Sequence, residues 1–343
     1  MKMANAAYQE NEDSIVDELI ENIYEMEEKR NPHVKVNEVV LLKKSWELRP
    51  ETYNKSAVFP FMVRKNHFGK HAKELLFVKQ YRKEVPDATA DFLLEKRVLP
   101  VIANEKIFAD LIYFQDKHLR LYLEGINWKT LDERIKDEKE SKLLPIIASF
   151  DTLEKHFNNL PKYKNKINRA LAHEGLALKK LTEDYYKEKL DKVLSTLDSH
   201  LDSQFKENLK NKYSDIATLL SDETFYTIAS RDAYPRHNMV ERLIDAAGIC
   251  ECSKALHLGC TFGHPSVYDQ LSTFQNGLPS LLKYFSEKID IKENDFEKFL
   301  KATYAGAVFG NLRLAAGYHS SSLSGIKEFK EDIETAREQL ELI

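Results

Sequence analysis

The stretch SRDAYPRHNMVERLIDAAG, residues 230–248, contains two aspartates, Asp232 and Asp245, and each of them follows a short apolar segment. A proline, a histidine and an asparagine lie between them. An isolated aspartate in such a position is most often a turn residue or a helix cap. Two carboxylates placed in this way are also what a phosphate-handling site requires. The rest of the chain has to decide between these two interpretations.

The composition is that of an ordinary globular protein. The 343 residues are 43% hydrophobic and 31% charged, which is enough for two lobes with separate cores. The sequence has no apolar run of membrane-spanning length, and residues 1–14 lack the apolar core of a signal peptide. A net charge of −4 offers no broad basic surface for nucleic acid. We therefore expect a cytoplasmic protein that binds neither membrane nor nucleic acid, and the sequence indicates no oligomeric state.

The apolar pattern divides the chain into three predicted parts. Residues 1–36 form an amphipathic helix, because apolar side chains recur at helical spacing from Ile15 to Tyr24. Residues 37–126 form an N-lobe with a nucleotide-binding sheet and one helix, and residues 127–343 form a helical C-lobe with a catalytic loop and a metal segment. The predicted fold class is α+β, a two-lobed protein-kinase-like fold with a small five-stranded antiparallel sheet.

The predicted N-lobe rests on short apolar segments separated by turn-like residues. A segment with helical spacing, residues 87–104, follows the third strand, and Pro100 ends or kinks this helix. The five segments that we interpret as strands are EVVLLKK, SAVFPFMVRK, ELLFVKQYRK, IFADLIYFQ and LRLYLEGI.

Transfer of a phosphoryl group needs a lysine on the phosphates, a carboxylate for that lysine, a carboxylate near the acceptor hydroxyl, and oxygen ligands for Mg²⁺. Lys79 lies in the third strand, and Glu95 on the following helix is placed to pair with it. Asp232 can accept the hydroxyl proton, and small residues after Asp245 leave room for a metal and phosphates. Alternatively, Lys79 is an exposed residue of a sheet edge, because lysine is rarely buried.

On these residues the chain resembles the protein-kinase-like small-molecule kinases of the aminoglycoside and choline phosphotransferase type. The resemblance covers about residues 37–320, with SRDAYPRHN similar to the catalytic loop and LIDAAG similar to the metal segment. It implies that Asp232 is the catalytic aspartate and that Asp245 binds Mg²⁺. It also implies that Lys79 binds the phosphates of ATP and that Glu95 holds this lysine.

Three further segments carry the resemblance. LYLEGI is similar to the hinge whose backbone holds adenine, which implies that Glu124 and Gly125 bind the nucleotide. PSVYDQL resembles a helix whose aspartate, Asp269 here, braces the catalytic loop. TYAGAVFGNLRLAAGY is similar to a late helix of the sugar-directed members, and its FGNLR portion is typical of a helix with a tightly packed glycine.

The sequence departs from the family pattern at several positions. Ser230 stands where histidine or glycine is usual, and Ala246 stands where phenylalanine or tryptophan follows the metal aspartate. The position of the metal-binding asparagine is occupied by His237, and Asn238 comes one residue later. Either of these two is then the second metal ligand. The sequence also has no glycine-rich GxGxxG loop between the first two strands.

A second group of candidate ligands follows the metal segment and offers an alternative site. Thiolate and imidazole ligands at this density can hold Zn²⁺, although their spacing is not that of common zinc modules. Cysteines are equally typical of small buried apolar positions. The five residues are Cys250, Cys252, His257, Cys260 and His264.

We therefore expect an ATP- and Mg²⁺-dependent enzyme that moves the γ-phosphate to a hydroxyl of a small molecule. Sugars, amino sugars and amino alcohols are all possible acceptors, since acceptor pockets in this architecture have no sequence pattern. The alternative is a pseudokinase that binds nucleotide or a regulatory partner without catalysis. The degenerate PRHN loop, Ala246 and the missing glycine-rich loop favour this alternative.

Overall fold

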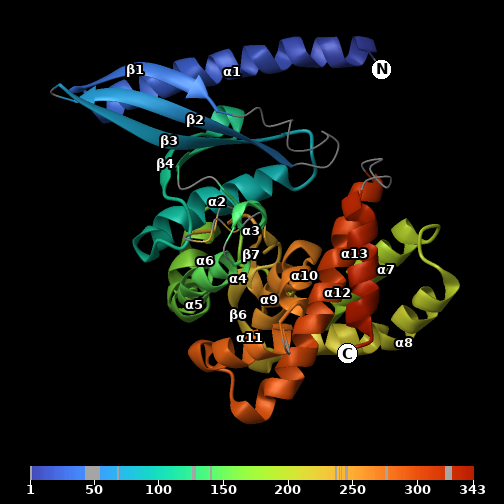
Figure 1. Cartoon of the computed structure of the whole chain (residues 1–343). Coiled ribbons are helices and arrows are strands. Elements are labelled where there is room, and N and C mark those ends of the chain that lie inside the picture. The colour runs from blue at the N-terminus through green and yellow to red at the C-terminus, as the bar shows by residue number, and fades with distance from the viewer. Residues whose placement is uncertain are drawn as a thin grey trace. The chain divides into compact units, whose positions relative to one another are not determined.

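An antiparallel sheet of five strands occupies the N-terminal part of the chain (Figure 1). The spatial order is β1-β2-β3-β5-β4, and every neighbouring pair of strands is antiparallel. The predicted five-stranded antiparallel sheet is thereby confirmed. The strands are β1 (Val34–Leu41), β2 (Ser56–His67), β3 (Lys70–Tyr81), β4 (Leu111–Gln115) and β5 (Arg120–Glu124).

The structure is a computed structural model that describes residues 2–42, 55–67, 69–125, 129–139, 141–235, 238, 240, 242–243, 246–274, 277–320 and 327–343. Side chains are described from residue 14 onward, except at position 67. Within these ranges, no helix combines the length and the apolar character needed to cross a membrane.

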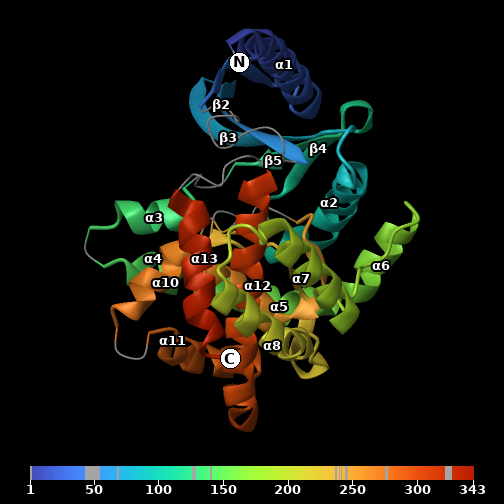
Figure 2. The ribbon, with the colours of Figure 1, turned by 90° about the vertical axis from the view of Figure 1, so that its right-hand side faces the viewer.

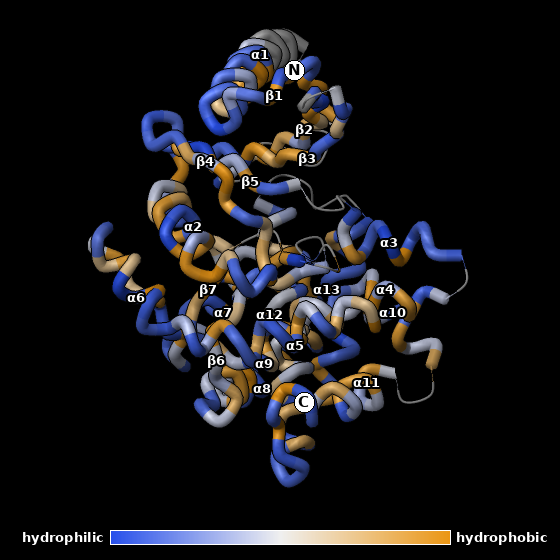
Figure 3. The backbone as a smooth tube through the Cα atoms, turned by 90° about the vertical axis from the view of Figure 1, so that its left-hand side faces the viewer, coloured by the Kyte–Doolittle hydropathy of each residue, from blue (hydrophilic) through white to orange (hydrophobic). Residues whose placement is uncertain are grey.

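The segment 1–36, predicted to form an amphipathic helix, contains α1 (Lys2–Arg30), which packs on the five-stranded sheet, and β1 begins within the same segment at Val34. Leu19 and Ile23 are fully buried in one apolar cluster with Phe61 and Val78 of the strands. Figure 3 shows hydrophobic stretches in the strands of this sheet. Burial of such side chains contributes about 1.5–3 kcal/mol each, so α1 is held mainly by this apolar face.

The helix predicted after the third strand is α2 (Ala88–Ile102), and Pro100 lies inside it rather than at its end. The strand predicted to start at Ile107 begins later, at Leu111. The reason is that the two ends of this apolar run pair with different segments. Its second part is β4, which pairs with β5, whereas the carbonyl oxygen of Ile107 in its first part accepts a hydrogen bond from the backbone N–H of Leu243, 2.7 Å away. Phe108 forms an isolated parallel bridge with the same leucine.

The contacts within the chain divide it into two units, each described here by itself. The first unit, called the sheet unit, comprises Met1–Phe92 and Ala109–Ile126. The second, called the helical unit, comprises Leu93–Phe108 and Asn127–Ile343. Helix α2 therefore contributes its first residues to the sheet unit and its remainder to the helical unit.

The helical unit consists mostly of helices (Figure 2), and it also contains a two-stranded antiparallel ribbon. The apolar segment before Asp232 is β6 (Tyr226–Ser230), and it pairs with β7 (Ile249–Ser253). Leu243, in the apolar segment before Asp245, forms an isolated bridge with Asn238. The main helices are α3 (Leu131–Asp137), α4 (Leu143–Ala148), α5 (Phe150–Asn159), α6 (Lys164–Ala172), α7 (Glu183–Leu197), α8 (Ser203–Leu220), α9 (Lys254–Phe262), α10 (Pro265–Ser272), α11 (Gly277–Ser286), α12 (Phe296–Ser320) and α13 (Lys327–Leu340).

Helices α9 and α12 cross with their backbones almost in contact. A Cβ atom added at Gly259 would lie 2.4 Å from the carbonyl oxygen of Thr303, and one added at Gly306 would lie 2.7 Å from that of Ala255. Real Cβ atoms do not approach so closely, so the crossing requires glycine at both positions. The packing glycine predicted in FGNLR is Gly310, where a Cβ would lie 2.8 Å from the Cys260 sulfur.

Candidate functional site

The loop that carries Asp232 begins where β6 ends. The pairing of Ser230 with Ile249 continues into a hydrogen bond from the backbone N–H of Arg231 to the carbonyl oxygen of Gly248, at 3.1 Å. The ribbon therefore fixes the start of the catalytic-type loop against the end of the predicted metal segment. This placement follows from the strand register alone and needs no side chain.

Ser230 positions the aspartate that follows it. Its side chain is buried, and its Oγ atom accepts a hydrogen bond from the backbone N–H of Asp232, at 3.2 Å. A Cβ atom at Gly248 would lie 2.7 Å from this Oγ and 3.4 Å from an Asp232 carboxylate oxygen. A side chain at position 248 would therefore collide with the Ser230 hydroxyl and crowd the Asp232 carboxylate, so glycine leaves both groups in their places.

Two guanidinium groups contact the Asp232 carboxylate. Arg313 of α12 donates from Nη2 to Oδ1 at 2.9 Å, and Arg231 donates from Nε to Oδ2 at 3.3 Å. Arg313 also donates to the backbone oxygen of Arg231, at 3.4 Å. The Asp232 side chain is 24% exposed, so a small molecule can reach it from solvent.

The same loop is tied to both helices of the glycine crossing. Thr261 of α9 donates its hydroxyl to the carbonyl oxygen of Ala233, at 2.5 Å, and Tyr234 donates to that of Gly310 on α12, at 3.3 Å. Because α9 and α12 pack with their backbones almost in contact, these two hydrogen bonds hold the loop against a rigid pair of helices. Rigid support is what holds a reactive group in a productive geometry.

Glu95 reaches the predicted metal segment through its backbone. The glutamate is fully buried, and its Oε1 atom accepts a hydrogen bond from the backbone N–H of Ala246, at 2.7 Å. Both residues belong to the helical unit. The contact does not use the side chain of Ala246, which explains how alanine can stand where the family has a large aromatic residue.

The predicted metal ligands are only partly described. Asp245 and His237 lie outside the described residues. Asn238 is buried; its Oδ1 atom accepts from the backbone N–H of Val240 at 2.7 Å, and Val240 has a φ of 69°. The amide of Asn238 therefore stabilises a strained turn. An amide oxygen has two lone pairs, so Oδ1 retains one acceptor position that suits a hard cation such as Mg²⁺.

The predicted nucleotide residues lie in the sheet unit. Lys79 is on the central strand β3 and only 5% exposed, so the alternative of an exposed lysine at a sheet edge is wrong. Its Nζ atom lies 5.0 Å from the centre of the Tyr81 ring. Glu124 ends β5, and the next residue, Gly125, donates its backbone N–H to the carbonyl oxygen of Leu75 at 2.8 Å.

The five candidate zinc ligands do not form a metal site. Within the described residues, no three histidine, cysteine or carboxylate side chains are placed to hold one ion. His264 instead caps α10 by accepting from the backbone of Ser266, and His257 stacks with His156 at 4.8 Å between ring centres. The three cysteines are buried, and burial raises the pKa of the Cys260 thiol to about 12. They act as small apolar residues.

Asp269, which the resemblance assigns as a brace for the catalytic loop, lies exposed on α10. Partial burial and Glu331 of α13 raise the pKa of its carboxyl group, and Lys327 acts to lower it. The contact from a distant part of the chain that holds Asp232 comes instead from Arg313, a residue that was not predicted to belong to the site. The sequence does contain a pattern that indicates Arg313. Gly306 and Gly310 are four residues apart and Arg313 follows three residues later, so all three lie near one face of the same helix.

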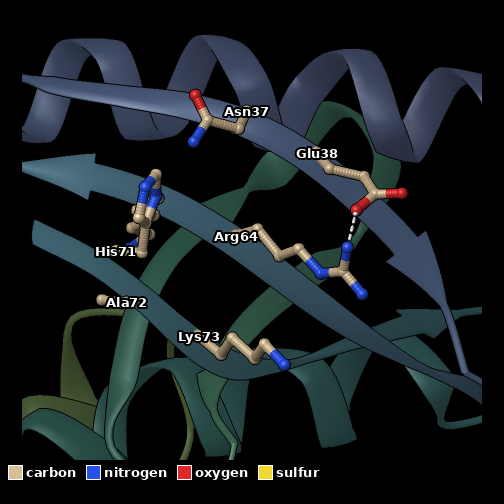
Figure 4. Close-up of a pocket in the computed structure, with 7 residues that line it drawn as sticks. Asn37, Glu38, Arg64, His71, Ala72 and Lys73 are labelled. Atoms are coloured by element: carbon tan, nitrogen blue, oxygen red, sulfur yellow. Dashed lines mark ion pairs between the residues drawn. The ribbon is translucent and has the colours of Figure 1, made fainter.

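A pocket with an accessible volume of about 570 Å³ lies on strands β1, β2 and β3 of the sheet unit. Figure 4 shows its residues projecting from these strands, with an ion pair of 2.7 Å between Arg64 and Glu38. The lining contains no residue of the predicted site. We therefore do not connect this pocket with the chemistry of Asp232. The lining residues are Asn37, Glu38, Arg64, Lys65, His71, Ala72 and Lys73.

The fold is shared with solved structures of small-molecule phosphotransferases and kinases. The GDP complex of wild-type aminoglycoside 2'-phosphotransferase-IIIa is similar over 94% of this chain and 98% of that one, with a TM-score of 0.60 and 11% identity. Macrolide 2'-phosphotransferase type I is similar over 93% and 96%, with a TM-score of 0.52 and 12% identity. The Plasmodium vivax ethanolamine kinase is similar over 90% of this chain and 82% of that one, with a TM-score of 0.52 and 11% identity.

Comparisons of sequence give no match: no protein-family model and no curated protein matches this chain. The structural likeness, at identities of 11–12%, establishes the fold. The predicted two-lobed kinase-like fold and the resemblance to the aminoglycoside and choline phosphotransferase type are confirmed at that level.

Proposed function

We propose that this protein transfers the γ-phosphate of a nucleoside triphosphate, ATP in our expectation, to a hydroxyl group of a small molecule. The observation that carries this proposal is the Asp232 carboxylate, held at the end of β6 by Arg313 and Arg231 and still 24% exposed. The fold shared with aminoglycoside and macrolide phosphotransferases supports it. A GDP complex of one of these neighbours makes GTP the competing donor to be measured.

In the proposed reaction, the acceptor hydroxyl donates a hydrogen bond to a carboxylate oxygen of Asp232. Each carboxylate oxygen has about two lone-pair positions, so an oxygen that already binds one guanidinium can still accept this bond. The hydroxyl oxygen forms a bond to the γ-phosphorus while the bond from that phosphorus to the β-bridging oxygen breaks. The hydroxyl proton passes to Asp232, and the nucleoside diphosphate leaves with the electron pair of the broken bond.

The remaining roles follow the family resemblance. We assign Lys79 to the donor phosphates, Glu95 to the support of that lysine, and the backbone around Glu124 and Gly125 to the base of the nucleotide. Asp245 is assigned to Mg²⁺, which neutralises the phosphate charge when bound. Asn238 or His237 supplies the second ligand, and oxygen is the better donor for this cation, which favours Asn238.

A second candidate function is a pseudokinase, a nucleotide-binding protein without catalysis. The observation that favours it is the same pair of arginines, because both Asp232 oxygens are engaged by positive charges. A carboxylate stabilised in this way is a weaker base than a solvated one. The two functions differ in a measurable way, since only the first requires a chemical role for Asp232.

The decisive experiment compares Asp232→Asn with the native protein in a screen for nucleoside diphosphate release with hydroxylated metabolites. We expect the variant to lose activity by about 10³-fold, since its amide cannot accept the proton. Asp137→Asn is the matched control, because Asp137 is exposed and pairs only with Lys129 among the described residues. Native activity in Asp232→Asn would exclude the proposed role.

Nucleotide binding separates the two candidates when no turnover is found. A ligand that binds only the folded protein raises its melting temperature. We expect ATP with Mg²⁺ to raise it more than ATP alone. A shift that is independent of Mg²⁺, together with no turnover of any acceptor, would support the pseudokinase instead.

A further inference from the structure

Among the described residues of the candidate site, two guanidinium groups contact one carboxylate, that of Asp232. In the part of the chain that the structure describes, Arg231 and Arg313 both form their ion pairs with Asp232. Burial acts to lower the pKa of Arg231, but the Asp232 carboxylate and Tyr185 act in the opposite direction, and the pKa is raised overall. Both guanidinium groups therefore remain charged, and one carboxylate faces two of them.

These guanidinium groups are partly exposed and rigidly held. The side chains of Arg231 and Arg313 are 22% and 24% exposed, so neither is fully solvated nor fully enclosed. The guanidinium carbon of Arg313 lies 5.5 Å from the centre of the Phe309 ring, a cation–π contact that restricts its motion. A guanidinium in this condition is well suited to bind an anion, because less solvation and less side-chain freedom are lost.

Tyr185 of α7 interacts electrostatically with the same three groups. Burial raises the pKa of this tyrosine, Arg313 and Arg231 act to lower it, and Asp232 acts to raise it. Two lysines, Lys179 and Lys189, place their Nζ atoms 4.7 and 5.7 Å from the centre of the ring. Glu188 pairs with Lys189 at 3.4 Å but is 75% exposed, so it offsets little of this charge.

We propose that the phosphate acceptor of this protein is itself an anion, a hydroxylated acid whose carboxylate binds Arg313 while its hydroxyl faces Asp232. This proposal rests on the proposed phosphotransferase function and names its substrate class. A carboxylate matches the planar donor geometry of a guanidinium, and charge-assisted hydrogen bonds of this type are strong. An amino sugar or amino alcohol would instead bring a cation next to two guanidinium groups.

The arginines have one other role to be distinguished, which is to bind the transferred phosphate. In that case their removal would weaken the reaction with every acceptor equally. In the proposed role, removal of Arg313 weakens the reaction with acids only. The two roles are separated by acceptors that are identical except for the charge of one group.

The test uses three six-carbon compounds that differ only at one terminal carbon: D-gluconate, D-glucitol and 1-amino-1-deoxy-D-glucitol. The same experiment is run with pooled hydroxy acids, neutral alcohols and amino alcohols, with release of nucleoside diphosphate as the readout. We expect kcat/KM to be at least about tenfold higher for the acids than for the amino alcohols. Preference for amino alcohols would overturn this inference and leave the phosphotransferase proposal intact.

Variants of Arg313 then identify the group responsible. Arg313→Gln should raise KM for the acid by about tenfold or more and leave KM for the nucleotide unchanged. Arg313→Lys should keep part of the preference, because it retains the charge but loses the planar fork. Arg337→Gln, which removes an arginine from an exposed ion pair with Asp202, is the control. If Arg313→Gln lost the same factor in kcat/KM with all three compounds, Arg313 would be assigned to the transferred phosphate, and the inference would be overturned.

A binding measurement covers the case in which no compound is phosphorylated. D-gluconate should raise the melting temperature of the native protein but not that of Arg313→Gln. This result would support the anion site and contradict the phosphotransferase. No shift with D-gluconate and no transfer to any acid would overturn both proposals.

Discussion

The two sides of helix α9 support the candidate site in different ways. One side packs on α12 through glycines, so that a Cβ at Gly259 would lie 2.4 Å from a backbone oxygen. The other side carries His257, which is fully buried and stacks with His156, 4.8 Å away between ring centres. The first contact is purely steric. The second depends on two imidazole rings that stay uncharged.

The glycine side of α9 determines where the site residues lie, whereas the histidine side contributes to the stability of the helical unit. The glycine side places Arg313 of α12 within 2.9 Å of Asp232 through close contacts of Gly259 and Gly306 with backbone atoms, which do not titrate. On the histidine side, burial lowers the pKa of the His257 ring, and the backbone of Ser230 in β6 opposes this effect only in part. The glycine contacts should therefore be insensitive to pH, whereas the stability of the helical unit should not be.

The largest effect is expected on the steric side. Gly259→Ala places its Cβ atom 2.4 Å from the oxygen of Thr303 and 2.5 Å from the nitrogen of Ala307, both of which are backbone atoms. We expect a loss of about 3 kcal/mol in the free energy of unfolding, despite the better helix propensity of alanine. Denaturant unfolding followed by circular dichroism measures this loss.

Gly175→Ala is the matched control for this substitution. Gly175 has a φ of 69°, but nothing lies within 4 Å of an added Cβ atom. Only the backbone strain remains, which costs about 1–2 kcal/mol. Equal losses in the two variants would show that the helix crossing is not sterically limited, and the comparison between the two sides of α9 would fail.

A smaller effect is expected on the histidine side when the pH falls. Burial lowers the pKa of His257 from 6.5 to about 3 and holds that of His156 well below its usual range. The unfolded chain therefore binds protons first as the pH falls below about 6.5, and stability decreases. Between pH 7 and pH 5 we expect a loss of about 2 kcal/mol from His257 alone.

A variant identifies the source of this pH dependence. His156→Phe removes one of the two titrating rings from a site that already contains Phe108 and Phe157 at ring-contact distance. Its melting temperature should fall less between pH 7 and pH 5 than that of the native protein. An unchanged pH profile would mean that the His156 ring does not contribute to the pH dependence.

The smallest effect is expected far from α9, at the surface ion pair of Arg337 with Asp202. Both side chains are at least 40% exposed. Exposed pairs contribute about 0–1 kcal/mol, so Asp202→Ser, which keeps a helix-capping oxygen for Phe205, should change the free energy of unfolding by less than about 1 kcal/mol. Thermal unfolding at low and high salt tests this, and a larger change would assign the pair a structural role comparable to that of the core.

Much of the fold could be predicted from local patterns. The strands alternate apolar residues, and the buried stripe of α1 from Leu19 to Met26 has helical spacing, so their positions follow from periodicity. The error at Ile107 and Phe108 arose because one apolar run serves two pairings. Strand β7 was missed because its cysteines were examined as metal ligands, although Cys250 and Cys252 are simply buried strand residues.

The candidate site was less predictable, because its contacts join distant parts of the chain. Asp232 could be identified from its place after an apolar segment. Arg313 could not, because it is 81 residues away and lies on a different helix. Glu95 was predicted as the partner of Lys79, and the backbone N–H of Ala246 could not be predicted as its partner, since any residue type except proline can supply such a donor.

The hydrogen bond from Ala246 to Glu95 also decides which substitutions at position 246 the contact can survive. The bond ends on a backbone N–H, so it does not depend on the chemical type of the side chain, and only proline removes the donor. The Ala246 side chain is fully buried, so a larger residue keeps the hydrogen bond only where the surrounding core can make room for it.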